Sequence, residues 1–161
     1  MKILVSPFSK PLRNGKRNPK DYPYWDTVFS GIHQLKHSIT QLCYSSEPLV
    51  ANDVHFENVR YFAYTKLHEV EDLLKAHDLF MSVDNFLPHL AHVMKKRGIV
   101  LWGKSDPAIF GYPENVNLLK DPKFLRKRQF DIWEAEEFDA SVFVDPEIVM
   151  KAVEEIAFSK K

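Results

Sequence analysis

The sequence predicts an α/β domain in which helices cover both faces of a mainly parallel sheet. Short continuous apolar runs, typical of strands buried on both faces, alternate with segments whose apolar residues recur at helical spacing. The length of 161 residues, with 45% hydrophobic and 27% charged residues, suits one ordinary globular domain. We therefore expect residues 1–161 to form a single domain.

The chain opens with a buried strand, a long loop and an amphipathic helix. Residues 3–5 are a short apolar run that Pro7 ends, and residues 8–22 are rich in Lys, Arg, Pro and Asn, as in a loop. Pro23 suits the first turn of a helix. The apolar face of that helix would comprise Trp25, Val28, Phe29, Ile32 and Leu35.

Two β-rich segments and a second helix follow. Residues 39–44 and 59–64 have strand composition and are separated by the turn-like stretch 45–53. The second helix is indicated by an apolar stripe at Leu67, Val70, Leu73 and Leu74.

Further alternation completes the pattern. Residues 79–83 form a buried strand, and Asp84 or Asn85 can cap the helix that follows. Gly98 begins the next strand, residues 99–102. A loop at 104–114, a short strand at 116–119 and a last helix opened by Pro146 are also expected, with the basic stretch 123–128 as a solvated helix face.

Composition limits the classes of function. Lys and Arg balance Asp and Glu at 22 each, so the net charge is zero, which speaks against tracking a nucleic-acid backbone as the main activity. The single cysteine, Cys43, allows no disulfide within the chain and is expected in the core. No apolar run has the length of a signal core or a membrane span. A cytoplasmic protein is the expectation.

Candidate ligand-binding residues follow the strands. In open α/β sheets ligands bind outside the carboxyl ends of the strands, which directs attention to loops 7–22, 84–89 and 103–113. The first carries five cations and leads into a helix, an arrangement that favours a diphosphate, although a solvated basic loop is the alternative. For the second, the alternative is that Asp84 or Asn85 only caps a helix and that His89 is a core residue.

The ordered set of these segments resembles the C-terminal domain of glycosyltransferase family nine, which includes the heptosyltransferases. Residues 82–91 (SVDNFLPHLA), 98–103 (GIVLWG) and 105–107 (SDP) are similar to the family's Asp-Ser/Thr-Gly-x-x-His helix start, its strand ending in Gly and its Thr-Asp-Pro-like turn. Earlier in the chain, residues 7–9 (PFS), 20–23 (KDYP) and 67–69 (LHE) resemble further family motifs in the same order. Phe8 and Phe86 depart from the pattern, because the family has glycine at both positions.

The resemblance implies a Rossmann-like domain, the donor-binding half of a GT-B glycosyltransferase. Ser9 and Lys20 would contact the phosphates of a nucleotide sugar, and the turn at Asp84, Asn85 and His89 would hold the diphosphate. The donor would be a substrate, and no cofactor or metal is implied, because GT-B folds neutralise the leaving phosphate with basic side chains and helix dipoles. A homodimer or a partner chain would supply the missing N-terminal, acceptor-binding half.

Three hypotheses about activity remain open at this point. The chain is a glycosyltransferase-like domain that binds a nucleotide sugar, with transfer depending on an acceptor site from a partner. Alternatively it is a non-catalytic module that senses or sequesters a nucleotide or nucleotide sugar. In the third, Phe8 and Phe86 fill the pocket and leave a structural remnant.

Overall fold

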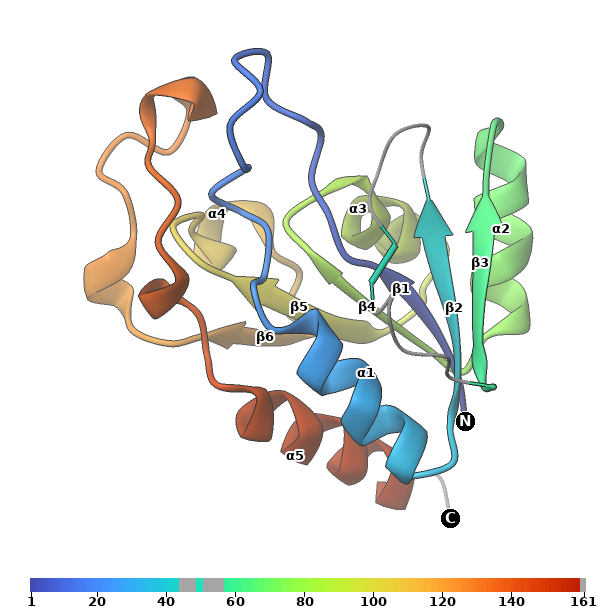
Figure 1. Cartoon of the computed structure of the whole chain (residues 1–161). Helices are drawn as coiled ribbons and strands as arrows, with labels where there is room; N and C mark the ends of the chain where they lie inside the picture. The colour runs from blue at the N-terminus through green and yellow to red at the C-terminus, as the bar shows by residue number, and fades with distance from the viewer. Residues whose placement is uncertain (44–48, 51–56, 160–161) are drawn as a thin grey trace.

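A six-stranded, all-parallel sheet forms the centre of the molecule (Figure 1). The computed structural model describes residues 1–43, 49–50 and 57–159. The strands lie in the order β3-β2-β1-β4-β5-β6, so β2 and β3 lie on one side of β1 and β4, β5 and β6 lie on the other. Their bounds are β1 Lys2–Ser6, β2 Ser38–Cys43, β3 Val59–Ala63, β4 Leu79–Val83, β5 Gly98–Trp102 and β6 Val116–Leu119. The predicted Rossmann-like α/β fold is confirmed.

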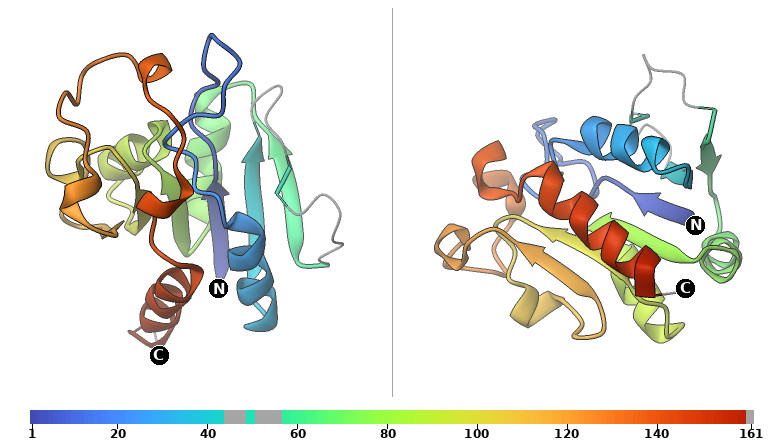
Figure 2. Two further views of the ribbon diagram at one scale, coloured as in Figure 1. Left: turned by 60° about the vertical axis from the view of Figure 1, so that its left-hand side comes forward. Right: turned by 90° about the horizontal axis from the view of Figure 1, so that it is seen from below.

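Helices cover both faces of the sheet, as the alternating pattern predicts (Figure 2). α1 and α5 pack on one face with the odd-numbered residues of the central strands, among them Val5, Met81 and Leu101. α2 and α3 pack on the other face with even-numbered residues such as Leu4, Phe80 and Val100. The helices are α1 Trp25–Gln34, α2 Leu67–Ala76, α3 Phe86–Val93, α4 Pro107–Phe110 and α5 Pro146–Ser159.

The register of the two central strands brings distant loops together. β1 pairs with β4 in parallel, and Ser6 lies opposite Ser82 at their carboxyl ends. The loop after β1 and the turn after β4 therefore start side by side, at the point where the strand order reverses and ligands bind in this kind of sheet.

Several local expectations differ from the structure. The expected loop 104–114 contains the one-turn helix α4, which begins after Asp106, whose carboxylate accepts from the Ala108 amide. Pro23 precedes α1 by two residues and does not lie in its first turn. The basic stretch 123–128 is no helix face: it holds the end of a short 3₁₀ turn and the buried Arg126. The predicted turn 45–53 lies mostly outside the described residues.

Candidate functional site

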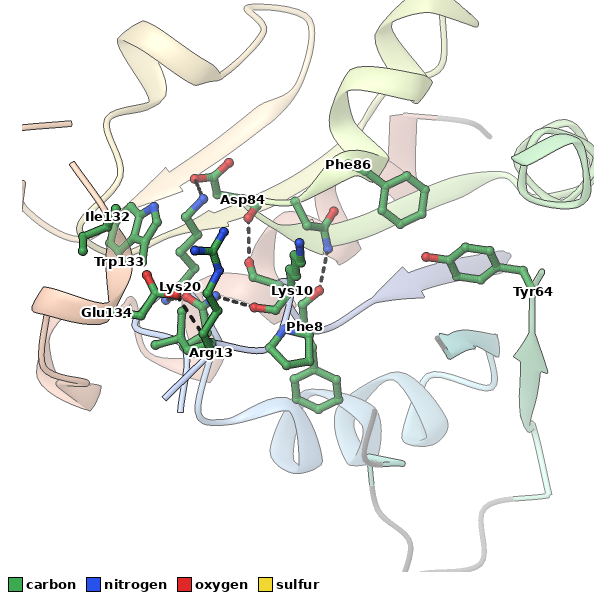
Figure 3. A pocket seen from close by; sticks show the side chains of 15 residues that line it. Phe8, Lys10, Arg13, Lys20, Tyr64, Asp84, Phe86, Ile132, Trp133 and Glu134 are labelled. Atoms are coloured by element: carbon green, nitrogen blue, oxygen red, sulfur yellow. Dashed lines mark hydrogen bonds and ion pairs between the residues drawn. The ribbon is translucent and has the colours of Figure 1, made fainter. Parts of the chain in front are cut away.

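A cavity of about 790 Å³ opens at the carboxyl ends of β1 and β4 (Figure 3). Its size is typical of pockets that bind small molecules. Four parts of the chain line it: the loop after β1, Tyr64 after β3, the turn Asp84–Phe86 and the segment Ile132–Glu134. Of the five residues that the sequence predicts as the site, Ser9, Lys20, Asp84 and Asn85 line this cavity together.

Hydrogen bonds join the loop after β1 to the turn after β4. The Ser9 hydroxyl donates to the Asp84 carbonyl oxygen at 2.7 Å, and the Ser9 amide donates to Asp21 Oδ1 at 2.7 Å. Ser9 is buried, so its hydroxyl is already committed to the protein. Its role in this structure is to fix the loop against the turn.

Asn85 holds the turn through both ends of its side-chain amide. Its oxygen accepts from the Leu87 amide at 2.9 Å and caps α3, as the sequence predicts for Asp84 or Asn85. Its nitrogen donates to the carbonyl oxygens of Ser6 and Phe8 at 3.1 and 3.0 Å. This one side chain therefore links α3 to the end of β1.

Lys20 and Asp84 form an ion pair at one side of the cavity. Lys20 Nζ lies 2.8 Å from Asp84 Oδ2, and the two side chains are 19% and 10% exposed. The same ammonium lies over the Trp133 ring, 4.8 Å from its centroid. The Arg126 guanidinium also lies over this ring, at 3.5 Å, and donates to the carbonyl oxygens of Gln129 and Asp131. The two cations thereby fix Trp133 as a side of the cavity.

Lys10 and Arg13 add positive charge to the lining of the cavity. Both side chains extend from the loop toward the turn at Asp84 (Figure 3). Among the described residues, neither the Lys10 ammonium nor the Arg13 guanidinium makes a hydrogen bond or an ion pair. Hydrogen bonds from the backbone N–H groups of Glu134 and Arg13, together with the charges of Arg13 and Lys10, lower the pKa of Glu134 below its usual value.

Aromatic side chains form the opposite side of the cavity. Tyr64 and Phe86 contact each other with ring centroids 5.6 Å apart, and Phe8, which packs against the core on the other face of the sheet, also lines the cavity. All three are partly buried. The cavity therefore has a cationic region beside an apolar, aromatic one.

The start of α3 offers fewer free amides than a helix usually does. Asn85 occupies the Leu87 amide, and Pro88, the third residue of the helix, has no N–H group. An anion in the cavity therefore depends more on side-chain cations than on this helix terminus.

His89 lies apart from the other predicted residues. It is exposed, is not among the residues that line the cavity, and contacts the Tyr112 hydroxyl through Nδ1 at 2.9 Å. It occupies the fourth position of α3, and its side chain meets the loop after α4. The structure thus separates His89 from Ser9, Lys20, Asp84 and Asn85.

Two parts of the lining were not predicted as binding residues. Trp133 lies in a charged stretch without clear periodicity, and Tyr64 ends an ordinary strand pattern, so neither carries a local signal. Lys10 and Arg13 were within the basic loop, but their spacing in the sequence does not distinguish them from Lys16, which pairs with Glu137 instead.

Comparisons with known proteins agree with this fold. The model of glycosyltransferase family 9 (heptosyltransferase) matches residues 9–131. The fold is similar to that of E. coli heptosyltransferase WaaC with ADP, with a TM-score of 0.68 and 16% identity over 96% of this chain and 44% of that one. E. coli ADP-heptose lps heptosyltransferase II gives a TM-score of 0.71 and 14% identity over 99% of this chain and 47% of its own.

A third similar structure is the dodecameric iron-containing heptosyltransferase TibC in complex with ADP-D-beta-D-heptose, with a TM-score of 0.56 and 15% identity. It is matched over 90% of this chain and 35% of its own. No curated protein matches the chain at a significant level. The chain thus spans less than half the length of these solved structures.

The fold is that of a Rossmann-like domain with a cavity at the carboxyl ends of its central strands. Because the family model matches well over half of its residues, the chain belongs to glycosyltransferase family 9. Within the described ranges, no helix is long and apolar enough to cross a membrane, and no group of three or more His, Cys, Asp or Glu residues could hold a metal ion.

Proposed function

We propose that this chain is the donor-binding part of a glycosyltransferase and that its cavity holds a nucleotide sugar. The observation that carries the proposal is the pairing of a cationic region with an aromatic one in a single cavity at the strand-order switch. A nucleoside diphosphate has the matching chemistry, because its phosphates are anionic and its base stacks on aromatic rings. The structurally similar WaaC and TibC are in complex with ADP or with an ADP-heptose, which supports this class of ligand.

We propose one orientation for the ligand in the cavity. The diphosphate would face the loop after β1, where Lys10, Arg13 and Lys20 extend, and the base would face Tyr64 and Phe86. Ser9, Asp84 and Asn85 would keep loop and turn in place for this contact. His89 would contact the donor only from the rim, through a part of the ligand that extends past α3.

Transfer of the sugar would also need an acceptor site. We propose that a second Rossmann-like domain, from another chain or a second copy, faces the cavity and supplies it. The support is the share of the solved structures that this chain covers, 44% and 47%. Light scattering of the purified protein, alone and with candidate partners, measures this association. A strict monomer at high concentration with no co-purifying chain would contradict it.

We also propose a cytoplasmic location. The support is that the chain has a single cysteine, the buried Cys43, and so cannot form a disulfide within itself, as expected for a protein that folds in a reducing compartment.

Calorimetry with nucleoside diphosphates and nucleotide sugars tests the donor site. We expect saturable binding of at least one nucleoside diphosphate, weakened at high salt because charge carries part of it. Lys123→Ala is the control, since Lys123 is exposed, pairs with Asp121 and lies outside the cavity lining. Absence of heat at millimolar concentrations of all these ligands would remove the proposed function.

A further inference from the structure

We propose that Lys10 and Arg13 form the phosphate-binding subsite of the cavity, while Lys20 serves as part of its wall. The inference rests on the proposed function, because it names the residues that recognise phosphate at the same site. It assigns the contact to two residues of the loop after β1 and not to the lysine that the family resemblance points to.

Lys20 is poorly suited to leave its present partner. It forms a short ion pair with Asp84, both side chains are largely buried, and its ammonium also lies over Trp133. Moving Lys20 to a phosphate would leave the Asp84 carboxylate unpaired and little hydrated beside the bound anion. With Asp84 in place, the pair presents no net charge to the ligand.

Lys10 and Arg13 differ from Lys20 in both exposure and pairing. Their side chains are exposed, line the cavity and, among the described residues, have no carboxylate partner. The planar guanidinium of Arg13 offers a fork of N–H donors that matches two phosphate oxygens. Glu134 also lines the cavity and its pKa is lowered by both cations, so with Lys20 paired to Asp84 the lining keeps a net positive charge that comes from Lys10 and Arg13.

Hydrogen bonds and an ion pair fix the loop that carries Lys10 and Arg13. The Asn18 side chain donates to the Lys10 carbonyl oxygen at 2.9 Å, which fixes one side of the loop. On the other side, Glu134 accepts from the Arg13 amide at 3.3 Å, so the hydrogen bond between these two residues uses the backbone of Arg13 and not its guanidinium. Lys16 pairs with Glu137 at 2.8 Å and adds a second tie to the same segment. Anchoring of this kind lowers the cost of ordering the loop on binding.

The turn after β4 makes the two cations more important. Because the Leu87 amide is capped and Pro88 has none, the first turn of α3 contributes little to anion binding. The phosphate charge must then be met by side chains, and Lys10 and Arg13 are the unpaired cations in the described lining of the cavity.

Calorimetry at low ionic strength with inorganic pyrophosphate, ADP and adenosine tests this assignment. We expect Arg13→Ala to weaken pyrophosphate and ADP about tenfold, with a larger loss in the Lys10→Ala/Arg13→Ala pair and no change for adenosine. Arg13→Lys should restore part of the affinity. Arg128→Ala is the matched control, because it removes the same charge from an exposed site outside the cavity.

A double variant with unchanged net charge tests whether Lys20 contributes to phosphate binding. Lys20→Met/Asp84→Asn removes the ion pair without changing net charge, and circular dichroism checks that it folds. We expect it to lose less ADP affinity than Arg13→Ala. A greater loss in this double variant, or ADP binding that is equal in wild type and Arg13→Ala, overturns the subsite and leaves the proposed function standing. Failure of ADP with retained, Arg13-dependent pyrophosphate binding removes the nucleotide and keeps the subsite, and failure of both ligands removes both.

Discussion

Replacing Asn85 should destabilise the protein by an amount that can be assembled from its hydrogen bonds. Asn85→Ala removes the cap of α3, which costs about 1 kcal/mol. It also removes the donor to the carbonyl oxygens of Ser6 and Phe8, at about 1 kcal/mol each where the acceptor stays shielded from water. Since the site is half-buried, we expect a total loss of about 2–3 kcal/mol, or about 4–12 °C in Tm.

Two further variants divide that loss into its parts. Asn85→Ser keeps a good capping oxygen but loses the amide donor, so it should recover about 1 kcal/mol relative to alanine. Asn85→Asp also keeps the cap, yet its carboxylate would face the Ser6 and Phe8 carbonyl oxygens, so it should do no better than serine. Urea unfolding followed by circular dichroism measures all three. A change below about 0.5 kcal/mol in Asn85→Ala would refute the view that this side chain joins the two loops.

Three other predictions concern the core and pH. Gly98→Ala would drive a Cβ into the ring of Phe80, so we expect a loss of about 1–3 kcal/mol in urea unfolding, and Phe80→Leu should recover part of it in the double variant. The Tyr22 hydroxyl donates to the Val144 carbonyl oxygen, and burial raises the pKa of this tyrosine. Above about pH 10 a tyrosine at this position ionises only in the unfolded chain, so the stability of the wild type should fall as the pH rises further. Tyr22→Phe should flatten that fall, and equal slopes in the two proteins would contradict the assignment. Burial lowers the pKa of His77, so stability should decrease as the pH falls below about 6.5, where the unfolded chain binds a proton first. His77→Asn should reduce that decrease in unfolding titrations between pH 7.5 and 5.5, and the remainder should come from His37, whose pKa burial also lowers.

Much of the fold could be predicted because its strands are buried on both faces. Residues 99–102 are an uninterrupted apolar run and residues 79–83 are apolar except for Ser82, and the structure has β5 and β4 there. α1 and α5 were predicted because each buries a single apolar stripe. Local patterns of this kind need no knowledge of distant neighbours.

The part of the site that could not be predicted depends on distant contacts. Trp133 is positioned by cation–π contacts with Lys20 and Arg126. Arg126 can be buried because its guanidinium donates to carbonyl oxygens of its own loop. A basic stretch that looks solvated in the sequence therefore contains a structural arginine. The pairing of Lys20 with Asp84 is equally invisible along the chain, although both residues were predicted to lie at one site.

The two phenylalanines that stand in place of the family's glycines reshape the cavity without filling it. Within the described part of the chain, positive φ outside glycine is confined to Lys36 and Lys95, so neither Phe8 nor Phe86 strains its turn. Phe86 contacts Tyr64 on the aromatic side, away from Lys20 and Asp84, and a volume of about 790 Å³ remains. A glycine would let a ligand approach the backbone closely, whereas phenylalanine offers a ring surface. Together with the capped Leu87 amide and Pro88, this favours a site that recognises its ligand mainly through side chains, with rings on one side and the cations of the loop after β1 on the other.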